Sequence, residues 1–211
     1  MQGWCKKGIA GRGILIDYAR YVEARGEVRD HLRGAIPLSE LEACLKQQKT
    51  EVKEGDILLI RFGWTKAYLA LDAAGRLDWS QRRPVELIGV ETSKAVARWL
   101  WDSGFSAVAA DTVAFEKQPF EAEGEPGGLE KIGLHEVLLG GWGMPIGEFR
   151  FVILVKLGEK ASNASNTGEM WDLEALSEAC AKMQRWSFFV TSMPLNIPGG
   201  VAGPANAMAI L

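Results

Sequence analysis

The spacing of apolar positions predicts strands and helices that alternate along the chain. Short, nearly unbroken apolar runs are typical of strands, and they occupy residues 13–17, 56–62, 105–111 and 186–191. Apolar side chains that recur every three or four residues predict helices over 37–48, 92–103 and 171–183. Strand, helix and strand in this order indicate an α/β fold with a layered sheet.

Other segments lack such periodicity. Residues 69–86 mix charges with glycine and proline, and residues 116–128 hold two prolines and several carboxylates, so both are predicted loops. Residues 129–139 are predicted to form a short helix that carries His135. Ser39 and Glu42 have the spacing of a capping box at the start of the helix over 37–48.

Composition favours one globular domain over residues 1–211. The chain is 47% hydrophobic and 24% charged, with a net charge of -3. It has no basic stretch long enough to follow a phosphate backbone, so nucleic acid is not an expected partner. No apolar run is long enough to span a membrane, and no signal segment is recognisable. Three cysteines without close spacing favour a reducing cytoplasm.

The chain has only two histidines, His31 and His135. A catalytic zinc site takes three protein ligands, often histidines, so the supply of imidazole is small. No GxSxG nucleophile elbow and no phosphate-binding loop is present. We expect His31 to be a surface residue without a role in a site.

A few residues remain as candidates for chemistry. His135 is a candidate metal ligand or general base, or else a histidine of an ordinary helix. Asp111 ends a predicted strand, where α/β sheets form binding crevices, although turn residues also occur there. Arg61 and Trp64 follow another strand and would line a pocket for an anion or an aromatic group, unless the arginine is ion-paired and the ring packed.

Four segments of the sequence resemble motifs of a known protein family. They are Gly-Asp-Ile-Leu-Leu-Ile-Arg-Phe-Gly-Trp at 55–64, Ala-Val-Ala-Ala-Asp-Thr at 107–112, the stretch from Leu-His-Glu-Val-Leu-Leu at 134–139 to Gly-Glu at 147–148, and the C-terminal strand and tail at 186–207. Together they resemble the cyclase family of metal-dependent hydrolases, to which bacterial kynurenine formamidase belongs. The resemblance covers most of residues 8–148 and 169–211.

This resemblance implies a swivelling β/β/α domain with a mixed central sheet and a bound zinc or manganese ion. Members hydrolyse an amide or a cyclic carbonyl compound, such as N-formylkynurenine, with a metal-bound water. His135 and Glu148 match catalytic, metal-binding positions, while Asp111, Arg61 and Trp64 would shape the pocket of a small-molecule substrate. Homo-oligomers are usual in the family.

Two departures from the family pattern lead to further expectations. The family has an early histidine-rich metal motif upstream of the segment that begins at Gly8, so we expect this chain to be truncated at its N-terminus. Residues 149–168 interrupt the family spacing, as an insertion or a retained intron would, which makes Glu169 an alternative to Glu148. The competing hypothesis is a fold relative without catalysis, or a truncated gene product, that acts only as a binding or scaffold domain.

Overall fold

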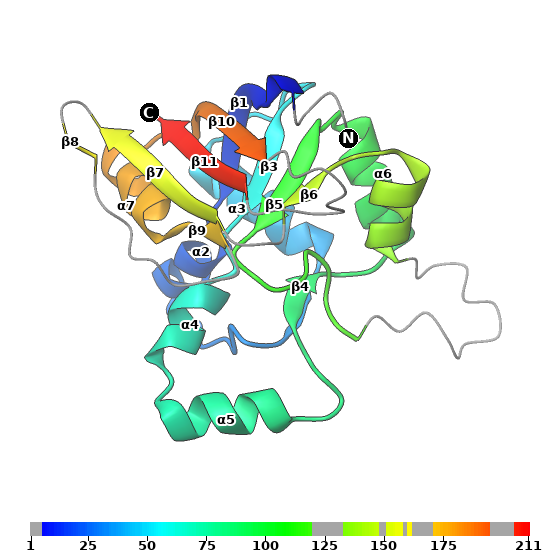
Figure 1. Cartoon of the computed structure of the whole chain (residues 1–211), viewed down its shortest axis with the longest axis vertical. Helices are drawn as coiled ribbons and strands as arrows, with labels where there is room; N and C mark the ends of the chain where they lie inside the picture. Colours follow the sequence, from blue (N-terminus) through cyan, green and yellow to red (C-terminus); the bar gives the residue numbers. More distant parts are fainter. Residues whose placement is uncertain (1–5, 120–132, 148–150, 158–159, 162–170, 195–204) are drawn as a thin grey trace.

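The computed structural model describes residues 6–119, 133–147, 151–157, 160–161, 171–194 and 205–211. Within them one mixed sheet runs in the order β6-β5-β3-β1-β10-β11-β7-β8, with β9 beside β7 (Figure 1). Its strands are β1 (Ile9–Ile16), β3 (Ile57–Ile60), β5 (Ala107–Ala110), β6 (Ile146–Gly147), β7 (Phe151–Leu157), β8 (Lys160–Ala161), β9 (Trp171–Asp172), β10 (Ser187–Pro194) and β11 (Ala205–Ile210). The predicted α/β class with a mixed central sheet is therefore confirmed.

Four neighbouring strands of the sheet run in parallel. β1 pairs with β3, β3 with β5, and β5 with β6, so their carboxyl ends lie at one edge. β10 is antiparallel to β1 and to β11. A second, two-stranded parallel sheet joins β2 (Gly34–Ile36) and β4 (Ile88–Val90).

Strand β7 falls inside residues 149–168, which the sequence marks as an insertion. It pairs in parallel with β11, where Ile153 lies opposite Ala207. The structure thus places this part of the segment in the main sheet. Its origin as an insertion or an intron stays a prediction.

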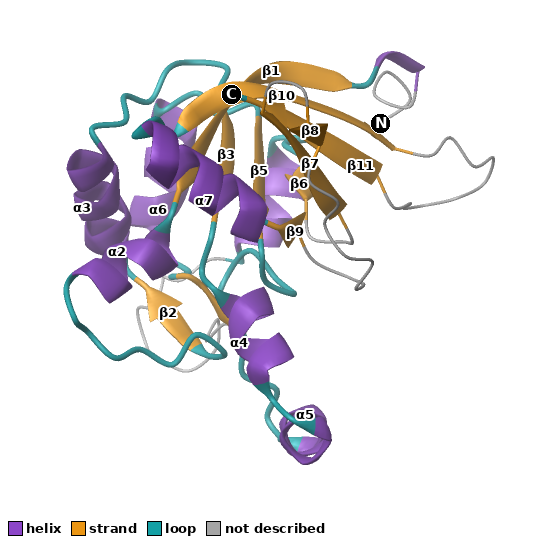
Figure 2. Ribbon diagram, turned by 90° about the vertical axis from the view of Figure 1, so that its left-hand side faces the viewer, coloured by secondary structure: helices purple, strands orange, loops and turns teal. Residues whose placement is uncertain are grey.

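Helices cover both faces of the sheet (Figure 2). The helices of the described residues are α2 (Tyr18–Ala24), α3 (Leu38–Gln48), α4 (Trp64–Ala70), α5 (Ala73–Gln81), α6 (Lys94–Asp102), the π-helix η1 (Glu136–Gly141) and α7 (Glu174–Met183). Helices α4 and α5 extend away from the sheet (Figure 1). Residues of α2, α3, α6 and η1 share one buried cluster with the strands, and residues of α7 share the other.

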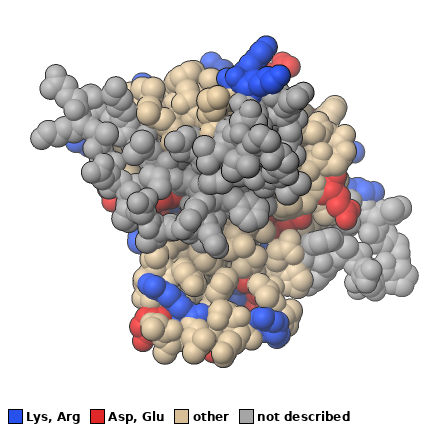
Figure 3. Space-filling model, in the orientation of Figure 1, with Lys and Arg blue, Asp and Glu red and all other residues tan. Residues whose placement is uncertain are grey.

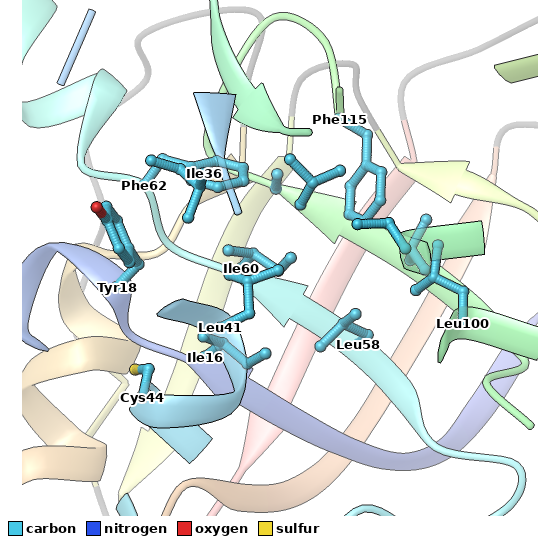
Figure 4. Close-up of a cluster of buried hydrophobic side chains, with 14 of the residues drawn as sticks. Ile16, Tyr18, Ile36, Leu41, Cys44, Leu58, Ile60, Phe62, Leu100 and Phe115 are labelled. Atoms are coloured by element: carbon cyan, nitrogen blue, oxygen red, sulfur yellow. The ribbon is translucent and has the colours of Figure 1, made fainter. Parts of the chain in front are cut away.

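Successive side chains of a strand point to opposite faces of the sheet, and this alternation produces the two clusters. Ile14 and Ile16 of β1 join Leu58 in the first cluster, part of which Figure 4 shows with Leu41 of α3. Leu15 points to the opposite face and joins the cluster beneath α7. Strands β3 and β5 are buried on both faces, and their sequences are apolar throughout. Each such side chain contributes about 1.5–3 kcal/mol when it is buried.

Several predicted elements are confirmed with small shifts of their ends. The helices predicted over 37–48 and 92–103 correspond to α3 and α6, and the strand over 105–111 corresponds to β5. Gly104 ends α6 with a φ of 66°, a left-handed value that glycine adopts without strain.

The prediction of a loop over residues 69–86 was wrong, because the segment contains the end of α4 and all of α5. The side chain of Asp72 accepts a hydrogen bond of 2.7 Å from the backbone N–H of Gly75, which caps α5. No residue of α5 is buried, so the helix has no apolar stripe that its sequence could reveal.

The predicted capping box at Ser39 and Glu42 does not form. Helix α3 begins at Leu38, and Pro37 is its N-cap without a side-chain hydrogen bond. The helix predicted from residue 171 begins at Glu174, because Trp171 and Asp172 pair with β7 as strand β9.

Among the described residues, no helix combines the length and apolarity needed to cross a bilayer; the longest, α3, has 11 residues. On the face shown in Figure 3, acidic and basic side chains of the described residues lie interspersed.

Candidate functional site

Three polar residues follow the carboxyl ends of adjacent parallel strands. Asp17 comes directly after β1, Arg61 after β3 and Asp111 after β5, and all three are almost fully buried. Carboxyl ends of parallel strands share one edge of a sheet, and binding sites of α/β folds commonly form there. The structure therefore brings the predicted residues Arg61 and Asp111 to the same edge.

Arg61 is held by two carboxylates. Its Nη1 lies 2.8 Å from Oδ1 of Asp17, while Nε and Nη2 donate to the two carboxylate oxygens of Glu174 at 2.8 and 2.7 Å. Burial alone would lower the pKa of the guanidinium, but these two carboxylates raise it above its usual value. Arg61 is thus an ion-paired arginine that ties β3 to α7, and its role in a substrate pocket stays a prediction.

Asp111 holds the loop that follows β3. Its Oδ1 accepts the backbone N–H of Phe62 at 2.6 Å, and its Oδ2 accepts that of Gly63 at 2.8 Å. Burial raises the pKa of this carboxyl to about 7, although the charge of Arg61 and the two N–H groups act in the opposite direction. Gly63 has a φ of 87°, which a larger residue rarely adopts.

Trp64 is packed within an aromatic cluster. Its ring stacks on Tyr68 with centroids 4.7 Å apart, and Trp79 meets both rings edge-on at 5.3 Å. The indole is almost completely buried, and its Nε1 has no hydrogen-bond partner within the described structure. The cluster joins α4 to α5. Trp64 is therefore a packed ring, which is the alternative to a pocket-lining role that the sequence leaves open.

His135 lies against a buried carboxylate, Glu116. One carboxylate oxygen, Oε2, accepts the backbone N–H of His135 at 3.0 Å, and the other, Oε1, lies 3.2 Å from Nδ1 of the ring. Glu116 is 1% exposed, whereas the side chain of His135 is 32% exposed. A buried acid thus supports an imidazole that reaches the surface.

Glu116 was not among the residues predicted from the sequence. It stands at the start of the predicted loop over 116–128, where a carboxylate is normally solvated. Its burial comes from a distant segment: Val90 of β4 donates its N–H to Phe115 at 3.0 Å, and Lys117 donates to Val90 at 2.9 Å. No local pattern in the sequence indicates this pairing.

His31 is partly buried beside the loop after β3. Its Nδ1 lies 2.6 Å from the carbonyl oxygen of Phe62, whose N–H is bound by Asp111. The expectation of a surface residue thus misses a specific contact to the strand end. Because the partner of His31 is a main-chain carbonyl group, which every residue has, no residue type in the sequence indicates this contact.

The remaining predicted site residues, Glu148 and Glu169, lie outside the described residues. Within the part of the chain that the structure describes, no group of three or more His, Cys, Asp or Glu side chains could hold a metal ion. His135 and Glu116 are two donors, and a catalytic zinc takes three protein ligands. The described residues by themselves therefore do not fit a zinc or manganese site.

The pair of Glu116 and His135 has the arrangement of a general base. A neutral imidazole accepts a proton near neutral pH, and a carboxylate on its other nitrogen orients the ring and stabilises the imidazolium that forms. Proton abstraction from water or from a substrate is the chemistry that such a pair performs.

Comparisons with known proteins agree with the fold. A family model described as "Cyclase: Putative cyclase" matches residues 3–117, which is more than half of the chain. A solved structure described as "Crystal structure of a novel cyclase" is 28% identical, with a TM-score of 0.69 over 98% of this chain. The match covers 55% of that protein, so this chain spans about half the length of its solved relative. A search of curated proteins finds no significant match.

Proposed function

Because this chain belongs to the cyclase family, we propose that it is a hydrolase of a small amide or cyclic carbonyl compound. Arylformamides such as N-formylkynurenine are the substrate class that the resemblance to kynurenine formamidase favours. The observation that carries the proposal is the contact between the ring of His135 and the buried carboxylate of Glu116.

In this proposal His135 is the general base. With its Nδ1–H directed to Glu116, the imidazole carries its lone pair at Nε2, which takes a proton from the water that attacks the carbonyl carbon. The C–N bond then breaks, and the imidazolium returns the proton to the leaving amine. For a formamide the products are formate and the free amine, so all atoms of water are accounted for.

A divalent metal, zinc or manganese, is part of the proposal as a cofactor. Its candidate ligands are His135 and Glu148, with Glu169 as the alternative to Glu148. Because Nδ1 of His135 faces Glu116, only Nε2 could bind the ion, and metal binding by His135 is therefore the alternative to its role as general base. When bound, such an ion polarises a carbonyl group. Since the described residues fall short of a complete site, the proposed proton transfer depends on His135 and Glu116 alone.

We also propose that the chain forms homo-oligomers and works in the cytoplasm. Three large apolar side chains on one sheet face, Phe189, Met193 and Ile210, are 39–54% exposed, which favours association with a second copy. Cys44 and Cys180 are free and fully buried, as is common for thiols in a reducing compartment.

The test is an assay of the purified chain with N-formylkynurenine and simple aryl formamides, combined with metal analysis. His135→Asn keeps a donor in the place of Nδ1 but removes Nε2, and we expect kcat/KM to fall at least about 100-fold. His31→Asn makes the same change at the other histidine and should retain activity. A wild-type chain that binds no metal and turns over none of these substrates would support the binding or scaffold hypothesis instead.

A further inference from the structure

We propose that Glu116 is a positioning residue that fixes the tautomer and the ring orientation of His135, and that Gly89 makes this possible by admitting the backbone of residues 116–117. The catalytic consequence rests on the proposed function, whereas the structural claim about the tautomer can be tested without any substrate.

The carboxylate of Glu116 makes two contacts to the same residue. Oε2 fixes the main chain of His135, and Oε1 faces Nδ1 of its ring. Holding both the backbone and the ring leaves the side chain little freedom to rotate. A carboxylate has acceptors only, so Nδ1 must be the donor and the lone pair is placed at Nε2.

The backbone around Glu116 is itself held against β4 at Gly89. A Cβ added at Gly89 would lie 2.3 Å from the carbonyl carbon of Glu116 and 2.4 Å from the nitrogen of Lys117. Both are backbone atoms that cannot swing away. Residues 116–117 therefore cross β4 at a distance that only glycine permits, and the hydrogen bonds that Val90 and Lys117 donate secure this crossing.

Other buried carboxylates of the chain have a different kind of partner. Asp17 pairs with Arg61 and Arg20, and Asp56 pairs with Arg12. In the described part of the chain, the carboxylate of Glu116 faces the imidazole of His135. Burying a carboxylate is costly unless its oxygens are bonded, so a carboxylate directed at an imidazole indicates a role for that imidazole.

Glu116→Gln tests the tautomer directly. The amide oxygen can still accept the backbone N–H of His135, but the amide NH₂ then faces Nδ1 and donates to it. We expect the His135 ring to change from the Nδ1–H to the Nε2–H tautomer, as seen in long-range ¹H–¹⁵N correlation spectra of the folded protein. The chain has two histidines, so His31→Asn assigns the signals. An unchanged tautomer in folded Glu116→Gln overturns the inference.

Kinetics supply the second readout. With a turned-over formamide, Glu116→Gln should lower kcat at least about 100-fold with KM nearly unchanged, because the base presents the wrong nitrogen. Asp56→Asn is the matched control, since it also removes a buried carboxylate but at the amino end of β3. An equal loss of kcat in both variants overturns the positioning role. If the wild-type chain is inactive, the proposed function fails, and the spectra still decide whether Glu116 sets the tautomer.

Discussion

Asp111 is a buried carboxyl whose ionisation is linked to folding. Its pKa is raised to about 7 by burial, against the charge of Arg61 and the N–H groups of Phe62 and Gly63, while the charge of Glu174 adds to the rise. A folded pKa above the unfolded value means that the native state binds more protons between pH 4 and 7. Stability from this group is complete below the unfolded pKa and is lost as pH rises to about 7.

We predict that Asp111→Asn removes this pH dependence. The wild-type free energy of unfolding should fall relative to the variant by up to about 1.4 kcal/mol per pH unit between pH 4.5 and 7, and then stay constant. Urea unfolding of both proteins across this pH range measures the difference between their free energies of unfolding. The contributions of the other titrating groups are the same in both proteins and cancel in this difference. A difference that is independent of pH would show that Asp111 titrates as an ordinary aspartate.

The contact between Arg61 and Glu174 joins two elements that are distant in the sequence, β3 and α7. Arg61→Met keeps much of the apolar stem but removes the buried one of the two arginines that pair with Asp17, and with it the cation that pairs with Glu174. We predict a loss of about 3–5 kcal/mol in the free energy of unfolding. Arg82→Met removes an exposed ion pair to Asp78 and should change stability by less than about 1 kcal/mol, as measured by urea unfolding. Similar small effects for both variants would contradict this account of the β3–α7 connection.

The close approach of residues 116–117 to β4 at Gly89 gives a second prediction about how elements pack together. Gly89→Ala places a methyl group against backbone that cannot move aside, so we expect a loss of about 1–3 kcal/mol and a lower melting temperature. Gly11→Ala in β1 meets only Ile57, at 3.6 Å, which is ordinary contact. Equal thermal melts for the two variants would show that the backbone at the crossing can move apart to admit a methyl group.

The elements that could be predicted well from the sequence are those whose buried side chains recur with a regular spacing of apolar residues. Helix α6 buries Val96, Ala97 and Leu100 on one stripe, and β3 is buried on both faces, so each is apparent from residue spacing. Helix α5 has no fully buried residue, so its sequence shows no such pattern. For the site, Asp111 and Arg61 were found because they end apolar runs. Glu116 was missed because its burial depends on β4, a pairing between segments that no single segment encodes.

The sheet as a whole is covered unequally on its two faces. Phe188 and Val190 of β10 pack beneath α7, together with Ala209 of β11. The alternate residues point to the other face, where Phe189 lies directly opposite Ile210 and the two are 49% and 39% exposed. Helices α2, α3 and α6 cover that face over β1, β3 and β5, and their buried cluster includes no residue among the described parts of β10 and β11.

This exposed apolar face predicts self-association. Sedimentation velocity over a range of protein concentrations should show the wild-type chain as an oligomer. Phe189→Thr combined with Ile210→Thr should weaken association at least about 10-fold, since each apolar side chain buried at an interface contributes more than about 1 kcal/mol. Threonine suits strands, so the melting temperature of the dissociated protein should change little. Leu77→Thr changes an apolar side chain on α5 that is still more exposed, at 58%, and should leave the oligomer intact. A wild-type chain that stays monomeric at every concentration would refute the homo-oligomer, and loss of association in Leu77→Thr alone would place the interface on α5 instead of the sheet.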